Sequence, residues 1–291
     1  MKPAPFALAQ PDDLAGVLAA LARHGEAARV LAGGQSLVPL MNLRLVRPAM
    51  LVSINRCAEL AFTERRGDRL VLGALVRQAE AETHPLVRAH CPLLAAALPW
   101  LGPQATRNRG TLCGSLAHAD PLAELPAVAL ALEADMLLAS QAGERRLPAS
   151  EFFQDALTTV LRPGEMVRAV AFQAQAGDER SAFLEIGNRE HGFAVAGVAV
   201  RWRLEAERCA FARIAMLGAG PVACRVPAAE AAIVGRPLDA GAIAEVVEAA
   251  RAAVAPPTDV HADADYRRHA LGVLLARALR QGDGQWASGS R

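Results

Sequence analysis

The sequence contains few of the residues that mark several large classes of protein. Its 291 residues include five cysteines and no Cys-x-x-Cys pair, a pattern that fits neither a disulfide framework nor a zinc or iron–sulfur site. The formal net charge of +1 does not favour nucleic acid or an anionic membrane as a partner. No run approaches the roughly 20 apolar residues of a membrane span, and no secretory signal is evident. We therefore expect a cytoplasmic protein that binds no nucleic acid and has no membrane span.

Signatures of catalysis are also missing. There is no G-x-x-x-x-G-K-[ST] segment, which excludes a P-loop. The segment "GAGPVA" (218–223) matches G-x-G-x-x-A, but Pro221 lies inside it and Pro227 would interrupt the helix that a dinucleotide fingerprint requires. No Ser–His–Asp order, carboxylate pair or metal-ligand cluster stands out. We expect no catalytic residue and no metal ligand on this chain, so any chemistry would belong to a bound cofactor.

The hydrophobic pattern predicts mixed helices and strands. A helix is expected over 11–25, followed by strands over 28–32 and 50–54, with a glycine turn at the end of the first strand. The final third changes to three alanine-rich helical segments, and prolines with "QAQAGDER" (173–180) separate it from the rest. We predict a first domain over 1–170, with subdomains of about 1–55 and 56–170, and a second domain over 171–291.

The glycine turn lies in "LAGGQSLVPLMNLRL" (31–45). Adjacent glycines bring no stability of their own, because each loses much backbone entropy on folding. Exposed N–H groups in such a turn can hold a pyrophosphate, which a Cβ atom would obstruct, and Ser36 could add a hydroxyl. The alternative interpretation is an ordinary tight turn at Gly33 and Gly34.

A second segment rich in small residues, "TLCGSLAHADP" (111–121), follows about eighty residues later. We expect it to be a loop that leads into an apolar helix from about Leu122. Its amides and hydroxyls could hold a second phosphate, while Asp120 or Glu124 accepts hydrogen bonds from ribose or ribityl hydroxyls. Two such loops indicate a long ligand held along a cleft.

Together these segments resemble a known family. "LAGGQSLVPLMNLRL" followed by "RNRGTLCGSLAHADPLAELPAVALAL" (107–132) is similar to the FAD-binding medium subunit of molybdenum hydroxylases, of the carbon monoxide dehydrogenase and xanthine dehydrogenase type. "FLEIGNREHGFAVAGVAV" (183–200) and "DADYRRHALGVLLARAL" (263–279) resemble the C-terminal domain of the same subunits. The resemblance implies an α+β fold. It consists of a two-part FAD-binding domain of the vanillyl-alcohol oxidase and p-cresol methylhydroxylase type, then a smaller α+β domain with an antiparallel sheet and helices.

The resemblance also implies a set of cofactor-binding residues. Residues 32–36 and 111–115 would form two pyrophosphate loops, Glu124 would bind FAD hydroxyls, and Asp120 would shape the second loop. The family usually has two adjacent glycines in that loop, whereas the first is Cys113 here. The full set is Ala32, Gly33, Gly34, Gln35, Ser36, Thr111, Cys113, Gly114, Ser115, Asp120, Glu124, Val167 at an aliphatic position near the flavin, and Phe193 at an aromatic one.

Four further residues lie in or beside these segments. His118 and His191 could tune the flavin, and Arg107 and Arg109 could balance the pyrophosphate charge. Each has an ordinary alternative, namely a hydrogen-bonded or exposed histidine and an arginine in a surface ion pair. For Phe193 the alternative is a place in the hydrophobic core.

The function implied by the resemblance is electron transfer within a heterotrimer. Substrate would be oxidised at a molybdenum cofactor on a large partner subunit, and [2Fe-2S] clusters on a small partner subunit would pass electrons to FAD on this chain. FAD would then reduce an acceptor such as NAD, a quinone or oxygen. Two alternatives remain: a stand-alone FAD-dependent oxidase that binds its own substrate, and a flavin-free scaffold subunit.

Overall fold

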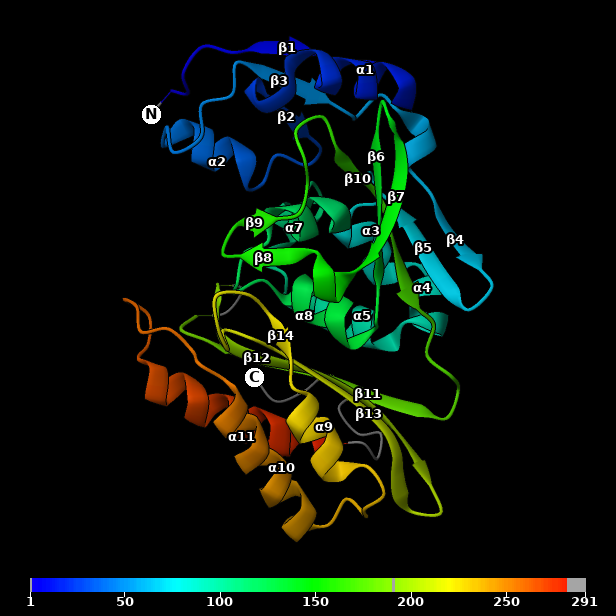
Figure 1. The fold of residues 1–291 in the computed structure, drawn as a ribbon, viewed down its shortest axis with the longest axis vertical. Coiled ribbons are helices and arrows are strands. Elements are labelled where there is room, and N and C mark those ends of the chain that lie inside the picture. The colour runs from blue at the N-terminus through cyan, green and yellow to red at the C-terminus, as the bar shows by residue number, and fades with distance from the viewer. Residues whose placement is uncertain (1, 190–191, 282–291) are drawn as a thin grey trace.

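A computed structural model describes residues 2–189 and 192–281 of the chain. Three units follow one another along its long axis (Figure 1): an N-terminal unit (7–53), a central unit (63–173) and a C-terminal unit (179–280). Each unit contains its own sheet. In the described part of the chain, no helix is long and apolar enough to cross a membrane.

The N-terminal unit is a small parallel sheet with two helices. Its strand order is β1-β3-β2, and both pairings are parallel. The first helix begins where predicted, because the Asp13 side chain accepts a hydrogen bond from the N–H of Gly16 and caps the helix. The elements are β1 (Ala7–Ala9), α1 (Leu14–His24), β2 (Ala28–Leu31), α2 (Leu37–Asn42) and β3 (Met50–Ser53).

The central unit is an antiparallel sheet with short helices beside it. The order of its strands is β4-β5-β10-β6-β7. Helix α8 is buried at every position, because it lies between this unit and the C-terminal sheet, with contacts to β12, β13 and β14. The strands are β4 (Thr63–Arg66), β5 (Arg69–Gly73), β6 (Asp135–Ser140), β7 (Gly143–Pro148) and β10 (Met166–Gln173), with a separate hairpin of β8 (Phe153–Asp155) and β9 (Thr158–Thr159). The helices are α3 (Gln78–Thr83), α4 (Pro85–His90), α5 (Pro92–Ala97), α6 (Gln104–Arg107), α7 (Leu112–His118) and α8 (Glu124–Ala131).

The C-terminal unit is an antiparallel sheet covered on one face by three helices (Figure 1). The sheet order is β11-β12-β13-β14. Alternate residues of β12 face opposite sides: Val198 and Val200 pack with the helices, whereas Ala199 packs with the core of the central unit. The elements are β11 (Glu179–Gly187), β12 (Ala194–Glu205), β13 (Arg208–Leu217), β14 (Cys224–Arg225), α9 (Pro227–Ile233), α10 (Ala240–Ala253) and α11 (Ala264–Arg280). The predicted fold class, an α+β chain of this two-domain type, is confirmed.

One element differs from the expectations. The segment predicted to be a loop over 111–121 contains α7, since the Thr111 hydroxyl accepts a hydrogen bond from the Gly114 N–H and so caps a helix. Strand β10 of the central sheet ends at Gln173, and β11 of the C-terminal sheet begins at Glu179. The chain thus leaves the central sheet a few residues after position 170, and the domain division at 170/171 stays a prediction.

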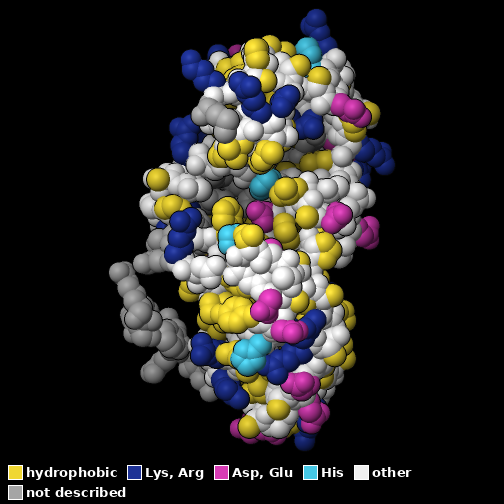
Figure 2. All heavy atoms as spheres, turned by 90° about the vertical axis from the view of Figure 1, so that its left-hand side faces the viewer, with side chains coloured by type: hydrophobic (Ala, Val, Ile, Leu, Met, Phe, Trp, Pro, Cys, Tyr) yellow, Lys and Arg dark blue, Asp and Glu magenta, His cyan; other side chains and the backbone are white. Residues whose placement is uncertain are grey.

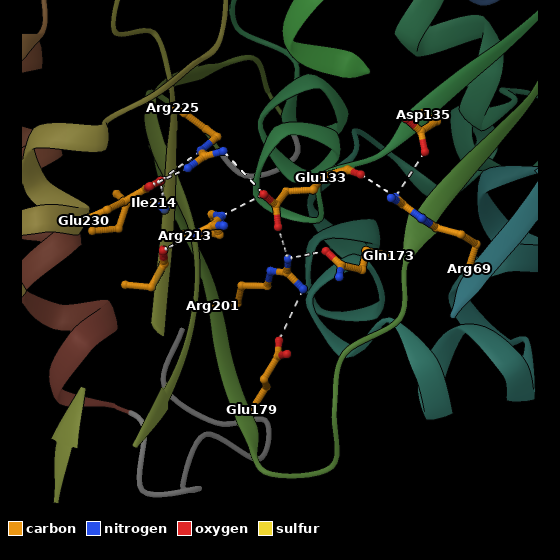
Figure 3. A network of polar contacts seen from close by, with 11 residues as sticks. Arg69, Glu133, Asp135, Gln173, Glu179, Arg201, Arg213, Ile214, Arg225 and Glu230 are labelled. Atoms are coloured by element: carbon orange, nitrogen blue, oxygen red, sulfur yellow. Dashed lines mark hydrogen bonds and ion pairs between the residues drawn. The ribbon is translucent and has the colours of Figure 1, made fainter. Parts of the chain in front are cut away.

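A polar network holds the central and C-terminal units together (Figure 3). Arg201 of β12, only 1% exposed, donates to Glu133 Oε2 at 2.7 Å and to Gln173 Oε1 at 2.9 Å, and pairs with Glu179 at 3.3 Å. Glu133 also forms an ion pair with Arg213, with 2.9 Å between Glu133 Oε1 and Arg213 Nε. These arginines hold the pKa of the Glu133 carboxyl below its usual value, against the opposing effect of burial. Glu133 of the central unit therefore binds arginines of two strands of the C-terminal sheet, β12 and β13.

Candidate functional site

The first glycine loop follows β2 directly. Gly34 has a φ of 72°, a conformation that side chains rarely adopt. A Cβ atom on Gly33 would lie 2.8 Å from the carbonyl carbon of Arg109 and 2.9 Å from the Cα of Gly110. The structure thus gives a different reason for the glycine at position 33 from the one expected. The backbone of the second segment, rather than a phosphate, excludes a side chain there.

Two residues that the sequence analysis missed hold the two segments together. Asn55 Nδ2 donates to the carbonyl oxygen of Ala32 at 2.9 Å. Arg77 donates to Asn55 Oδ1 and to the carbonyl oxygen of Arg109, both at 2.6 Å. Burial lowers the pKa of Arg77, and the charge of Arg109 contributes to that shift. Asn55 comes just after a predicted strand, but nothing in the sequence pairs it with Arg77.

The loop itself presents unused hydrogen-bond donors. The N–H groups of residues 33–36 donate to no acceptor within the described chain. Three of these residues, 33–35, line a hollow of about 330 Å³. Figure 2 shows the surface hollowed between the N-terminal and central units. The hollow is lined by Gly33, Gly34, Gln35, Val38, Pro39 and Arg109.

Arg109 is the cation of this hollow. Its side chain makes no ion pair with any described residue, so its charge is available to an anion. Arg107 has the ordinary role instead: it is 6% exposed, pairs with Glu82 at 3.0 Å and donates to Gln104. Unpaired N–H groups beside a free guanidinium form an environment that suits a pyrophosphate.

The second segment presents the first turn of α7. Thr111 is buried and uses its hydroxyl for the cap, so that oxygen already has a partner. Gly114 is exposed and Ser115 is half-buried, so both can be reached from solvent. A Cβ on Gly114 would lie 2.7 Å from Thr111 Oγ1, which explains why a glycine follows the cap.

Cys113 differs from Gly114 and Ser115 because its side chain is buried in the core. The thiol is 2% exposed and lies 3.8 Å from the carbonyl oxygen of Leu72, and burial raises its pKa to about 12. Any contact with a ligand would therefore use its backbone.

A Cys113→Gly variant is expected to bind FAD as tightly as the unaltered chain, or more tightly. Its free energy of unfolding should fall by about 1 kcal/mol or more, because glycine disfavours the helix and leaves a small cavity. FAD titration and urea unfolding measure the two effects separately, with Cys113→Ala as the control that keeps helix propensity. A clear loss of FAD affinity in Cys113→Gly would show that the thiol contributes to binding.

The acidic residues lie where α7 turns into α8. Ala119 ends α7 in the left-handed conformation, with a φ of 53°, and Asp120 Oδ1 then accepts a hydrogen bond from the Leu122 N–H at 2.9 Å. Glu124 is 8% exposed, and burial, with a smaller effect of the Asp120 charge, raises its pKa to about 7. A carboxyl group in this state can accept or donate a hydrogen bond to a hydroxyl.

The remaining candidates are spread more widely. Val167 is 5% exposed and packs in the core of the central unit, whereas Phe193 is 68% exposed. His118, in the last turn of α7, is half-buried. His191 lies outside the described residues. No group of three or more potential metal-binding side chains occurs within residues 2–189 and 192–281.

Comparison with known proteins matches both parts of the chain. Residues 4–172 match the model of the FAD binding domain in molybdopterin dehydrogenase, and residues 181–281 match the CO dehydrogenase flavoprotein C-terminal domain. The chain belongs to this family. It is therefore an oxidoreductase flavoprotein, and its cofactor is FAD.

Its relatives include subunits of several dehydrogenases. The 6-hydroxypseudooxynicotine dehydrogenase complex subunit alpha of Paenarthrobacter nicotinovorans is 37% identical over 96% of this chain and 95% of its own length. The carbon monoxide dehydrogenase medium chain of Hydrogenophaga pseudoflava is 33% identical over 96% and 97%. A solved carbon monoxide dehydrogenase from that organism superposes with a TM-score of 0.94 at 34% identity, covering 97% of this chain and 98% of the other.

Proposed function

We propose that this chain is the FAD-binding medium subunit of a cytoplasmic heterotrimeric molybdenum hydroxylase. A large partner would bind the molybdenum cofactor, and a small partner would bind [2Fe-2S] clusters. The relatives are named as subunits or medium chains of dehydrogenases, which supports an assembly of this kind over a stand-alone oxidase. The observation that carries the proposal is the loop at 33–36: its N–H groups donate to no acceptor in the described chain, and residues 33–35 line the hollow together with Arg109.

The proposed site assigns a task to each group of residues. The N–H groups of residues 33–36 and the first turn of α7 would hold the pyrophosphate, and Arg109 would balance its charge. Asn55 and Arg77 keep the two segments at a fixed separation. Bound FAD supplies the ability to accept and release electrons, which no side chain of this chain provides. The domain division at 170/171 and the places of Val167 and Phe193 near the flavin belong to the same proposal.

Glu124 is proposed to bind a cofactor hydroxyl. A Glu124→Ala variant is expected to weaken FAD binding by about 1–3 kcal/mol, because the cofactor hydroxyl would lose a partner in a buried place. Fluorescence titration of the chain with FAD gives the dissociation constant. The exposed Glu151 provides a matched control as Glu151→Ala. Equal affinities of Glu124→Ala and the unaltered chain would rule out the assigned role.

The assembly itself is tested by the composition of the native complex. The tagged chain is purified from its own host. The contents of FAD, molybdenum, iron and acid-labile sulfide are then measured per mole of the tagged chain. The proposal predicts that all four co-purify with two further polypeptides. Flavin without molybdenum or iron, together with substrate turnover by the isolated chain, would favour the stand-alone oxidase. A complex without flavin would favour the scaffold.

A further inference from the structure

One arginine of helix α11 is fully buried against the C-terminal sheet. Arg267 is 0% exposed, whereas the side chain of its neighbour Arg268 is 35% exposed. A buried charge is costly unless it is paired and hydrogen-bonded. Arg267 Nη2 meets this need by donating to both carboxylate oxygens of Asp259, at 2.8 Å and 2.7 Å. The function proposed above gives this ion pair no task.

The other side of the guanidinium reaches the beginning of β12. Arg267 Nη1 donates to the carbonyl oxygen of Val195. Gly218, which follows β13, lies against the same carbonyl group: a Cβ atom on Gly218 would lie 2.5 Å from the Val195 oxygen and 3.3 Å from Arg267 Nη1. Gly218 also has a φ of 67°, so both space and backbone conformation favour a glycine there. The arginine is thus bound where the beginning of β12 meets the end of β13.

Gly218 extends this path into the central unit. Its N–H group donates to the carbonyl oxygen of Pro121 at 3.1 Å. Pro121 lies in the turn between α7 and α8, directly after Asp120, and α8 begins at Glu124. Each step from the buried guanidinium to this turn is therefore a direct contact.

The loop before α11 holds the ion pair in place. Asp259 Oδ1 also accepts hydrogen bonds from the N–H groups of His261 at 2.8 Å and Ala262 at 3.2 Å. The N–H group of Ala255, in the same loop, donates to the carbonyl oxygen of Ala219 at 3.1 Å. The loop is thus attached to the end of β13, and its own backbone fixes the carboxylate that binds the arginine.

We propose that Arg267 is a positioning residue for the FAD site. With Asp259 it fixes the junction of β12 and β13, and the hydrogen bond from Gly218 to Pro121 lets this junction hold the turn before Glu124. The inference rests on the proposed function, because it takes Glu124 to bind an FAD hydroxyl. A hydrogen bond weakens steeply when its partners are misaligned, so a displaced turn loses this contact. Arg267 acts on the cofactor only through the turn.

A double-mutant cycle between Arg267→Met and Glu124→Ala tests this path. FAD dissociation constants are measured by fluorescence titration of folded chains. Arg267→Met is expected to weaken FAD binding by about tenfold, as for the loss of one buried hydrogen bond. In the Glu124→Ala background the same substitution should change the affinity by less than about twofold, because the contact that Arg267 positions is already absent. A purely stabilising role would not produce this coupling.

The matched control is Arg268→Met. Arg268 is the next residue of the helix, and it pairs with Asp265 of the same helix at 2.8 Å. Its replacement is expected to leave the FAD dissociation constant unchanged within about twofold.

Gly218→Ala tests the same path without removing the buried charge, and it decides the question if Arg267→Met does not fold. The added methyl group collides with the Val195 carbonyl group. Gly235→Ala is the control, because Gly235 has a φ of 82° but no atom within 4 Å of an added Cβ. Both variants have the cost of a positive φ, so their difference reports the collision. We expect FAD binding to weaken by about tenfold in Gly218→Ala alone, and only where Glu124 is present.

The outcomes separate this inference from the proposed function. Equal FAD affinities of folded Arg267→Met and Arg268→Met would overturn the positioning role, and so would a loss that adds fully to that of Glu124→Ala. The same criteria apply to Gly218→Ala and Gly235→Ala. Unchanged affinity in Glu124→Ala itself would remove the role of Glu124 and this inference with it. Absence of FAD binding by the unaltered chain would overturn the proposed function.

Discussion

A Gly33→Val variant is expected to lose FAD while the C-terminal unit still folds. Any Cβ at this position collides with the backbone at Arg109 and Gly110, which cannot move as a flexible side chain could. Arg77 also holds the Arg109 carbonyl group in place. Overpacking of this kind costs about 1–3 kcal/mol. The displacement also separates the two segments proposed to hold the pyrophosphate, so FAD affinity should fall by about a hundredfold or more.

The variant is compared with Gly177→Val. Gly177 has no atom within 4 Å of an added Cβ and does not have a positive φ, so it controls for the general effect of replacing a loop glycine. The absorbance of bound flavin per purified chain gives the retention of FAD, and circular dichroism reports the fold. Flavin content equal to that of the unaltered chain would show that the loop at 33–36 does not hold the pyrophosphate.

An Arg201→Met variant is expected to lose about 3 kcal/mol of stability, because removal of one partner leaves buried charges uncompensated. Arg201 is 1% exposed and contacts Glu133, Gln173 and Glu179. Methionine fills much of the space of the arginine stem, so the loss reports the charge and its hydrogen bonds rather than a cavity. The contacts lie across the boundary between two units (Figure 3), so unfolding should also become less cooperative.

The control for this variant lies two residues further along the strand. Arg203 is about one-third exposed and pairs with the exposed Glu205 at 3.1 Å, so Arg203→Met should cost about 1 kcal/mol or less. Urea unfolding is followed by fluorescence and by circular dichroism. Equal losses in the two variants would show that the network at Glu133 does not hold the units together.

Local patterns were enough to predict much of the fold. Asp13, Asp239 and Asp263 each cap a helix that the sequence predicted, because capping depends on residues within one turn. The apolar runs at 28–32 and 50–54 likewise identified the strands β2 and β3. Helix α7 was missed because its small residues are typical of loops, and the Thr111 cap outweighs that preference.

Contacts between distant residues could not be predicted in this way. Arg201 lies among apolar residues in the sequence, and its partner Glu133 is 68 positions away. Asn55 and Arg77 are 22 positions apart, yet Arg77 donates a hydrogen bond to Asn55 Oδ1. The sequence marked the residues proposed to contact FAD, whereas the residues that hold them in place became visible only in three dimensions.

The identity and amount of the cofactor released by acid from the purified chain test the FAD assignment most directly. We expect a flavin spectrum before release and, by chromatography, FAD in an amount that matches the protein. A folded, colourless chain that cannot be reconstituted with added FAD would contradict it. In that case the free N–H groups of residues 33–36 would have to serve another purpose.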